Sequence, residues 1–292
     1  AVGRGRRAPP VGRLLPPLQP DAEAGQSGDT AAEAPVEAFD LAEPRPVAEV
    51  MFMDFLGVCL DQILNQMAKF RYMFGGKARV PLTVRTVSGA GMRSAAQHSQ
   101  SLYWMTTGIP GLKTVIPSNP ADAKGLLLAA IRDDDPVIFC EAKGVLMQRG
   151  EVPEGDYTIP IGQAKVVRAG GDVTLVAFGA TVAVALAAAE QLAREGTEAE
   201  VLDLRSLQPL DEAAILSSLE KTGRLVVVDE STPRCGIASD VAALCVDRGF
   251  DFLNAPVKRV TAPHTPVPFA AILEDAFRPS AEKVIAAVRE MG

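Results

Sequence analysis

The stretch from Thr86 to Ser101 contains the residues most suited to chemistry. It follows an apolar, β-branched run at 80–87, which predicts a buried strand, and then changes to glycine, small polar residues and a Gln-His-Ser-Gln sequence around His98. His98 is one of only two histidines in the chain. Its imidazole could titrate near neutral pH and transfer a proton. The alternative is a loop histidine bonded only to its neighbours, and the residues alone leave both interpretations open.

The elements around this stretch form strand and helix units in the first half of the chain. A polar loop after a buried strand places its side chains at the carboxyl edge of a sheet, where open α/β folds bind ligands. We predict strands at 46–53, 80–87 and 136–140, with a short strand after Gly108. A helix is predicted from 121 to about 132, with Ser118 or Asn119 as its cap and Pro120 near its first turn. We also predict a helix from Asp54, as its N-cap, to about Met73. One face of that helix is expected to be buried, with the stripe Phe55, Leu56, Val58, Cys59, Ile63 and Met67.

A second series of strand and helix units follows the proline- and glycine-rich stretch 150–171, which we interpret as a linker. Strands are predicted at 173–178, 200–204, 224–229 and 257–261, and helices at 182–195, 211–222, 236–248 and 280–289. Gly223 is expected to end the second of these helices. Such alternation predicts an α/β fold with parallel sheets and right-handed crossovers. Asp229 and Glu230 end one strand and could form a site, but paired acids at such an edge are more often solvated, which is what we expect. His264 lies in a proline-rich loop and is expected to be a structural surface histidine.

Composition limits the class of protein. A chain of 292 residues is long enough for about two domains. Its content of 48% hydrophobic but only 5% aromatic residues predicts an aliphatic core of helices on parallel sheets. The net charge is −7, without a basic stripe beyond the first residues, so nucleic acid is not an expected partner. Four widely spaced cysteines argue against zinc and disulfides and favour reduced thiols in the cytoplasm. The uncharged run 173–189 predicts a strand leading into a helix, and no membrane segment.

Residues 1–44 have a different composition from the rest. Alanine, proline and glycine make up 21 of these 44 residues, and no apolar period runs through them. Such a segment cannot offset the entropy lost on ordering, so we predict that it is disordered or that it is an artefact of gene reading, such as a shifted frame. A targeting presequence is the alternative.

Several motifs together carry a family resemblance. They are Arg-Pro-Val-Ala-Glu-Val-Met-Phe-Met-Asp-Phe at 45–55, Asp-Gln-Ile-Leu-Asn-Gln at 61–66, Lys-Phe-Arg-Tyr-Met-Phe-Gly-Gly at 69–76, Ala-Ala-Gln-His-Ser-Gln at 95–100, Pro-Gly-Leu-Lys at 110–113, Ala-Ile-Arg-Asp at 130–133, Asp-Leu-Arg at 203–205 and Pro-His-Thr-Pro-Val-Pro-Phe at 263–269. The chain resembles the β subunits of thiamine diphosphate-dependent 2-oxo acid dehydrogenases, and it is most similar to their acetoin branch. The resemblance implies a transketolase-like pyrimidine-binding domain at 45–150, incomplete at its N-terminus, a linker at 151–170 and a transketolase C-terminal domain at 171–292.

The resemblance also implies roles for individual residues. Phe55 matches the phenylalanine that packs on the cofactor pyrimidine, although by itself it would be interpreted as a core aromatic. His98 matches the histidine near the thiazolium and the substrate, where it would assist proton movement. A structural potassium ion is implied at Leu82, Ala130, Ile131, Asp133 and Asp135, because oxygen ligands suit a hard cation. Without the resemblance, the acids at 133–135 would be interpreted as a solvated turn.

The family further implies an α subunit in an α2β2 heterotetramer. The cofactor lies between α and β, and the α subunit carries the Gly-Asp-Gly and Asn signature for Mg²⁺ and the diphosphate, which this sequence does not contain. The implied reaction cleaves acetoin or a 2-oxo acid and transfers the acyl group to a lipoyl acyltransferase component. An Ile-Ser-Glu-type motif is also not found in residues 1–44, so we expect the chain to be inactive or impaired. A remnant that retains only subunit binding, and a generic α/β ligand-binding domain, are the alternatives.

Overall fold

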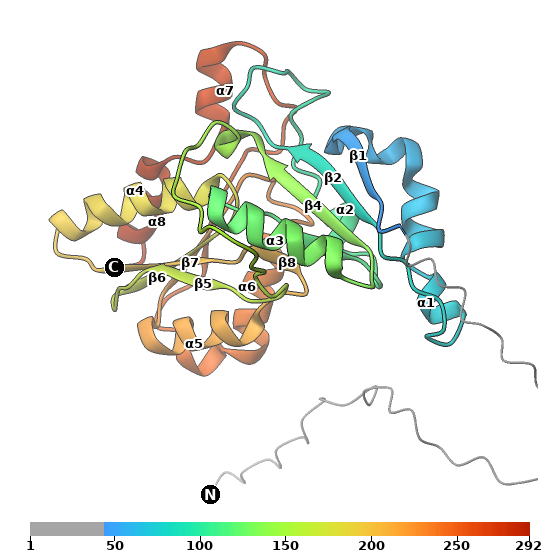
Figure 1. Ribbon diagram of the computed structural model, residues 1–292. Helices are drawn as coiled ribbons and strands as arrows, with labels where there is room; N and C mark the ends of the chain where they lie inside the picture. The colour runs from blue at the N-terminus through green and yellow to red at the C-terminus, as the bar shows by residue number, and fades with distance from the viewer. Residues whose placement is uncertain (1–43) are drawn as a thin grey trace, which may run out of the picture. The chain divides into compact units, whose positions relative to one another are not determined.

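Two five-stranded sheets form the framework of the computed structural model, which describes residues 44–292 (Figure 1). The first sheet has the order β1 (Val47–Phe52), β2 (Thr83–Ser88), β4 (Val137–Ala142), β3 (Lys113–Val115) and β8 (Ser206–Gln208). The second has the order β10 (Lys258–Thr261), β9 (Leu225–Asp229), β6 (Val173–Ala177), β7 (Ala199–Asp203) and β5 (Lys165–Arg168). The predicted α/β class is confirmed. The predicted disordered or artefactual segment, apart from Pro44, lies outside the described residues.

Each sheet ends in one antiparallel strand, which the sequence does not predict. β8 pairs antiparallel with β3, and β5 pairs antiparallel with β7, whereas all other neighbours are parallel. Strands of three or four residues are too short for a periodic signal. Because β8 follows β7 in sequence, the second half of the chain supplies the last strand of the first sheet.

Helices cover both faces of the second sheet. α4 (Thr181–Arg194) and α8 (Ala281–Arg289) pack against one side, and α5 (Glu212–Thr222) and α6 (Ile237–Arg248) pack against the other. The three central strands β6, β7 and β9 are buried along their whole length, as expected for strands with helices on both faces. Local signals place the helix ends, since Asp211 accepts a hydrogen bond from the Ala214 amide and Gly223 ends α5 in the left-handed conformation.

The first sheet is covered by α3 (Pro120–Arg132) on one face. The helix begins at the cap Asn119, whose side chain accepts from the Asp122 amide, with Pro120 in the first turn, as predicted. Leu126 packs with Val137 and Phe139 of the sheet. On the opposite face, Met53, Leu56 and Tyr103 belong to a core that also contains Phe178 and other residues of the second half. One hydrophobic core therefore connects the two sheets.

The long helix predicted from Asp54 is wrong in form. The segment is a 3₁₀ helix, η1 (Met53–Cys59), a π-helix, η2 (Gln62–Met67), and a short α1 (Phe70–Met73). In a 3₁₀ helix residues three apart share a face, so Met53 and Leu56 are buried while Phe55 is 39% and Val58 is 89% exposed. The predicted burial is confirmed at Leu56, Ile63 and Met67 and is wrong at Phe55 and Val58. Cys59 is half-buried.

Shorter elements complete the described residues. They are α2 (Trp104–Thr107), η3 (Lys143–Val145), η4 (Phe250–Phe252) and α7 (Ala271–Phe277). The sequence does not predict α7, because seven residues give too short an amphipathic period. Residues 148–164 contain no helix or strand, and β5 begins inside the stretch interpreted as a linker. No helix within residues 44–292 is long and apolar enough to cross a membrane.

Candidate functional site

Three neighbouring strands of the first sheet end at one edge. The parallel register pairs Phe52 of β1 with Val87 of β2, and Ser88 of β2 with Ala142 of β4. Three segments continue from these ends: η1 from β1, the His98 loop (residues 89–101) from β2, and η3 from β4. Carboxyl ends of parallel strands are the usual ligand-binding edge of such sheets. The topology therefore brings the loop predicted from sequence to the expected position.

Phe52, Phe55 and His98 form an aromatic cluster at this edge. The ring centroids of His98 lie 5.0 Å from Phe52 and 5.2 Å from Phe55, and the two phenylalanine centroids are 6.0 Å apart. All three pairs are close to perpendicular, which is a favoured aromatic geometry. Phe55 keeps 39% of its surface exposed, and His98 is half-buried. The structure thus brings together the two residues predicted for cofactor and substrate, and leaves an apolar surface beside an imidazole.

Lys143 contacts this cluster, although none of the sequence motifs identifies it as a site residue. It is 4% exposed, donates a hydrogen bond to the His98 carbonyl, and lies 4.8 Å from the Phe52 ring centroid. Burial lowers the pKa of its amine, although the charges of Asp54, Glu274 and Glu230 partly oppose this effect. Its position directly after β4, at the carboxyl end of a mostly buried strand, is the sequence signal that could have identified it.

Two buried carboxylates of the second half hold the start of the His98 loop. The Ala90 amide donates to Glu230 Oε1 at 3.1 Å, and the Gly91 amide donates to Glu274 Oε1 at 2.8 Å. Arg93 donates to Glu274 Oε2 from its backbone amide at 3.2 Å and from its guanidinium at 2.6 Å. Figure 1 shows α7, which carries Glu274, next to this loop. The loop is therefore fixed by groups from far along the chain.

Asp54 holds the other end of the loop. Its Oδ1 accepts from the Gln100 backbone amide at 3.2 Å and from the Gln100 side chain at 2.9 Å. The Gly89 amide also donates to the Gln100 carbonyl at 3.2 Å, which closes the loop on itself. Asp54 was predicted to cap a helix, and that prediction is wrong because its carboxylate binds the loop instead.

Asp229 and Glu230 are buried, which contradicts the expectation of solvated charge. Both carboxylates are at most 5% exposed, because the His98 loop and α6 pack against the end of β9. Burial raises the pKa of Glu230 to about 7, although Arg278 and the Ala90 amide lower it. Burial also raises the pKa of Asp229, whose oxygens accept from the amides of Ser231 and Ala238. Acids directly after a buried strand were the signal that was misinterpreted.

Replacing Glu230 with glutamine should change the dependence of stability on pH. The pKa of Glu230 is raised from 4.5 to about 7, so the folded protein binds this proton more tightly than the unfolded chain. Its stabilising effect is complete below pH 4.5 and is lost as the pH rises through 7. At pH 8 the Glu230→Gln variant should therefore be more stable by up to about 3 kcal/mol.

Urea denaturation between pH 4 and 8 measures this effect. Glutamine keeps an oxygen that accepts from the Ala90 amide, so the comparison isolates the charge. The exposed Glu154→Gln change is the matched control and should leave the profile unchanged. Parallel pH profiles for wild type and Glu230→Gln would contradict the prediction.

The residues predicted to bind potassium gather at the opposite edge of the first sheet. Arg45 Nη1 donates to the carbonyls of Ile131 at 3.4 Å and Asp133 at 2.9 Å. The Leu82 carbonyl accepts from the Val137 amide at 3.0 Å, and the Ala130 carbonyl accepts from the Asp133 amide at 3.3 Å. These oxygens suit a hard cation, and each carbonyl has a second lone pair. Each of them nevertheless already accepts a hydrogen bond from the protein.

The acidic turn at 133–135 is held by basic side chains. Lys113 Nζ lies 2.7 Å from the Asp133 carboxylate and 3.3 Å from that of Asp135. Arg71 lies 2.6 Å from Asp135, and Arg45 lies 2.6 Å from Asp134. The residues alone predict a solvated turn and the family resemblance implies a potassium site, and the structure shows a turn in which all three acids form ion pairs.

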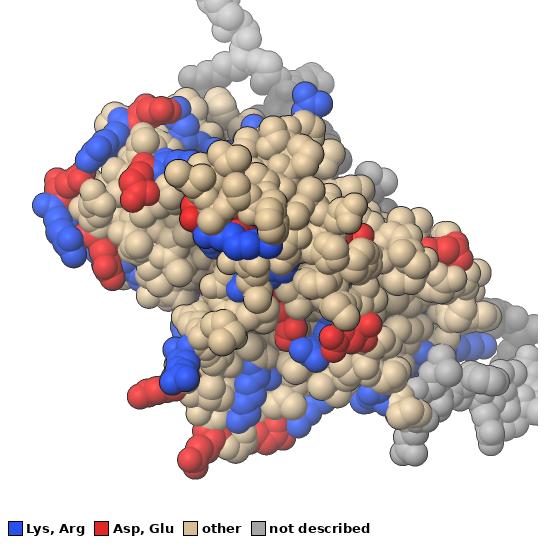
Figure 2. Space-filling view, turned by 90° about the horizontal axis from the view of Figure 1, so that it is seen from above, with Lys and Arg blue, Asp and Glu red and all other residues tan. Residues whose placement is uncertain are grey.

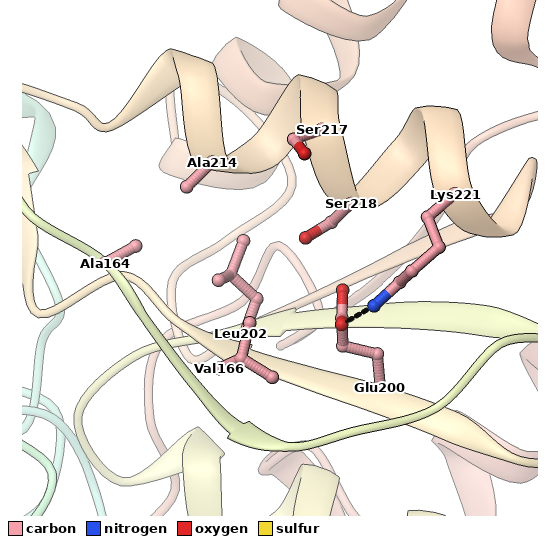
Figure 3. A pocket seen from close by; sticks show the side chains of 8 residues that line it. All are labelled: Ala164, Val166, Glu200, Leu202, Ala214, Ser217, Ser218 and Lys221. Atoms are coloured by element: carbon pink, nitrogen blue, oxygen red, sulfur yellow. Dashed lines mark hydrogen bonds and ion pairs between the residues drawn. The ribbon is translucent and has the colours of Figure 1, made fainter.

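A separate pocket of about 310 Å³ lies between α5 and the strands β5 and β7 (Figure 3). Its polar end is the buried Glu200, whose carboxylate pairs with Lys221 of α5. Small and apolar side chains line the remainder, among them Ala164, Val166 and Leu202. None of the residues predicted to form a functional site lines this pocket.

Charged side chains are dispersed over the face drawn in Figure 2. Basic and acidic groups lie beside one another there, separated by broad uncharged areas. Many surface charges in residues 44–292 form ion pairs, such as Arg289 with Glu195 at 2.8 Å. Exposed pairs of this kind contribute little to stability, so they do not identify a functional surface.

Comparisons with known proteins agree with the two halves of the structure. Residues 36–148 match the transketolase pyrimidine binding domain, and residues 162–284 match the transketolase C-terminal domain. A solved structure described as a split gene transketolase, inactive beta4 tetramer, superposes with a TM-score of 0.69 at 25% identity, covering 84% of this chain and 75% of that one. The fold predicted from the resemblance is confirmed.

Two curated relatives are more similar in sequence. The chain is 60% identical to the acetoin:2,6-dichlorophenolindophenol oxidoreductase subunit beta of Bacillus subtilis strain 168, over 93% of this chain and 78% of that protein. It is 58% identical to the protein of the same name from Cupriavidus necator, over 84% of this chain and 73% of that protein. The chain therefore contains transketolase pyrimidine-binding and C-terminal domains and belongs to the family of acetoin oxidoreductase β subunits.

Proposed function

We propose that this chain is the β subunit of a thiamine diphosphate-dependent dehydrogenase that cleaves acetoin or a pyruvate-like 2-oxo acid. The observation that supports this most directly is the aromatic cluster of Phe52, Phe55 and His98 at the carboxyl edge of the pyrimidine-binding domain. The names of both relatives refer to acetoin oxidation, which agrees with the proposal. The acyl product passes to a lipoyl acyltransferase component, as the family resemblance implies.

The residues of the cluster fit an aromatic cofactor ring. Thiamine diphosphate supplies the electron sink for cleavage of the bond next to a carbonyl. Phe55 offers an exposed ring face on which a flat heterocycle can pack, and this contact excludes water from one side. The His98 imidazole, held edge-on to Phe55, takes or returns a proton at a substrate oxygen.

The remainder of the site is assigned to a partner. We propose that an α subunit holds Mg²⁺ and the diphosphate, in an α2β2 heterotetramer located in the cytoplasm. We also propose a division of this chain into a pyrimidine-binding domain at 45–150, a linker at 151–170 and a C-terminal domain at 171–292. The shared core between the sheets means that the two domains are expected to unfold together.

Reconstitution with a matched α subunit tests the function. We expect thiamine diphosphate with Mg²⁺ to bind the mixture more tightly than either subunit alone, measured by calorimetry, and acetoin or pyruvate to reduce 2,6-dichlorophenolindophenol. Binding that does not depend on mixing the subunits would contradict the proposal.

The proposed potassium site gives an independent prediction. Potassium bound to the carbonyls of Leu82, Ala130, Ile131 and Asp133 and to Asp135 would stabilise the folded state by mass action. We therefore expect a higher Tm in potassium chloride than in choline chloride at equal ionic strength, measured by calorimetry. Lys113→Met should enlarge the difference, because it removes a competing cation from Asp133 and Asp135. An identical Tm in both salts would exclude the site.

A further inference from the structure

Lys143 is a buried cation whose contacts are to neutral groups. Only 4% of the residue is exposed, and none of the carboxylates in residues 44–292 lies within salt-bridge distance of its ammonium. Burying a charge without an ion-pair partner is costly. A buried methionine of similar length would avoid this cost, so packing alone does not account for a lysine here.

The contacts of Lys143 converge on the aromatic cluster. Its ammonium donates to the backbone carbonyl of His98, and it faces the Phe52 ring with 4.8 Å between Nζ and the ring centroid. Phe52 in turn contacts the His98 imidazole edge-to-face at 5.0 Å. One cation therefore binds the backbone of His98 and also the ring that supports its side chain.

The other hydrogen bonds that anchor this loop lie on either side of His98. Glu230 and Glu274 bind the loop at residues 90–93, and Asp54 binds it at Gln100. Between these anchors Ala95 has a positive φ of 58°, a conformation that costs energy for a residue with a side chain. The hydrogen bond from Lys143 falls at His98 itself, between the two anchored ends.

We propose that Lys143 is a positioning residue that fixes the His98 imidazole between Phe52 and Phe55. The loss of activity expected without Lys143 rests on the proposed function. The expected change in the position of the imidazole does not. The ammonium acts through the His98 carbonyl and the Phe52 ring and does not exchange a proton in the reaction. A displacement of about 1 Å at a reacting group can cost about 100-fold in rate, so the expected effect is large.

NMR spectroscopy of the full chain tests the structural consequence directly. The chain contains only two histidines, so the imidazole signals of His98 and the exposed His264 can be assigned by substitution. In Lys143→Met the His98 signal should shift and the cross-peaks between His98 and Phe52 should weaken, while the His264 signal stays in place. Lys143→Arg, which keeps a cationic donor, should retain most of these cross-peaks.

Lys124 provides a matched control. Its ammonium also donates to backbone carbonyls, those of Pro153 and Gly155 at 2.8 Å, and it also faces an aromatic ring, Tyr157 at 4.9 Å. Lys124→Met removes the same kinds of contact outside the cluster and should leave the His98 signal unchanged. The Tm of each variant is measured by thermal denaturation. Lys143→Met should have the Tm of the wild type or a higher one, because the substitution removes a buried charge.

Activity of the reconstituted complex gives the second measurement. Lys143→Met should lower kcat by about 10-fold to 100-fold with little change in the KM of substrate, and Lys143→Arg should recover most of the loss. An unchanged His98 signal in Lys143→Met would overturn the proposal. A Tm lowered equally in Lys143→Met and Lys143→Arg would also overturn it, since the role would then be structural. A mixture of the two subunits that does not bind thiamine diphosphate would refute the proposed function and leave the NMR test of Lys143 intact.

Discussion

Replacing His98 with alanine should lower kcat of the reconstituted complex by about 100-fold to 10,000-fold, the range for loss of a general acid–base group. The structure supports this because His98 is the histidine that lies in the aromatic cluster, at the carboxyl edge of three parallel strands. The binding of thiamine diphosphate should change much less, since Phe55 still offers its ring. Steady-state kinetics with acetoin and with pyruvate, together with calorimetry of cofactor binding, measure both effects.

The other histidine provides the control for this experiment. His264 is exposed in the loop after β10, and His264→Ala should leave kcat within the error of the wild type. His98→Asn should be nearly as slow as His98→Ala, because an amide cannot accept and release a proton near neutral pH. A His98→Ala complex with wild-type kcat would show that the histidine does not take part in the reaction.

Replacing Glu274 with alanine should lower the free energy of unfolding by about 3 to 5 kcal/mol, because each of several buried donors that loses its acceptor costs about 1 to 3 kcal/mol. Glu274 is fully buried and accepts hydrogen bonds from the amides of Gly91 and Arg93 and from the Arg93 guanidinium. Without the carboxylate these donors lose their acceptor at the junction between the His98 loop and α7. Urea denaturation at pH 7 measures the change.

Asp275 is the matched control, because it pairs with the same Arg93 at 2.8 Å but its side chain is 58% exposed. Asp275→Ala should cost less than about 1 kcal/mol. The effect of Glu274→Ala should also fade in acid. Burial acts to raise the pKa of Glu274, but the hydrogen bonds from Gly91 and Arg93 outweigh it and lower that pKa, so its stabilisation is present above pH 4.5 and is lost as the pH falls. Equal costs for the two variants would contradict the prediction.

Local sequence patterns predicted most of the elements. The strands and helices that were predicted in the second half lie within a few residues of their predicted positions, because strands with helices on both faces and amphipathic helices have clear periods. The cap Asn119 and the end of α5 at Gly223 followed from the chemistry of single residues. The position of His98 at a sheet edge followed from the order of strand and loop. Its family role came from motifs and could not be derived from periodicity.

Tertiary contacts decided the features that the local patterns missed. Phe55 was predicted to be buried but is partly exposed, because η1 turns with three residues instead of 3.6. Glu230 was predicted to be solvated, but the loop at Ala90, 140 residues away in sequence, covers it. Lys143 bonds to a carbonyl 45 residues away.

The sequence by itself therefore determined which segments form strands and helices and where His98 lies relative to them. Only the tertiary structure decided which polar side chains are buried and which groups they bind by hydrogen bonds. The physical reason is that the period of apolar residues indicates which face of a helix or strand is buried. The burial of a charge depends instead on the distant segment that packs against it. Glu230, Glu274 and Lys143 are each buried by such contacts, and all three act on the loop that carries His98.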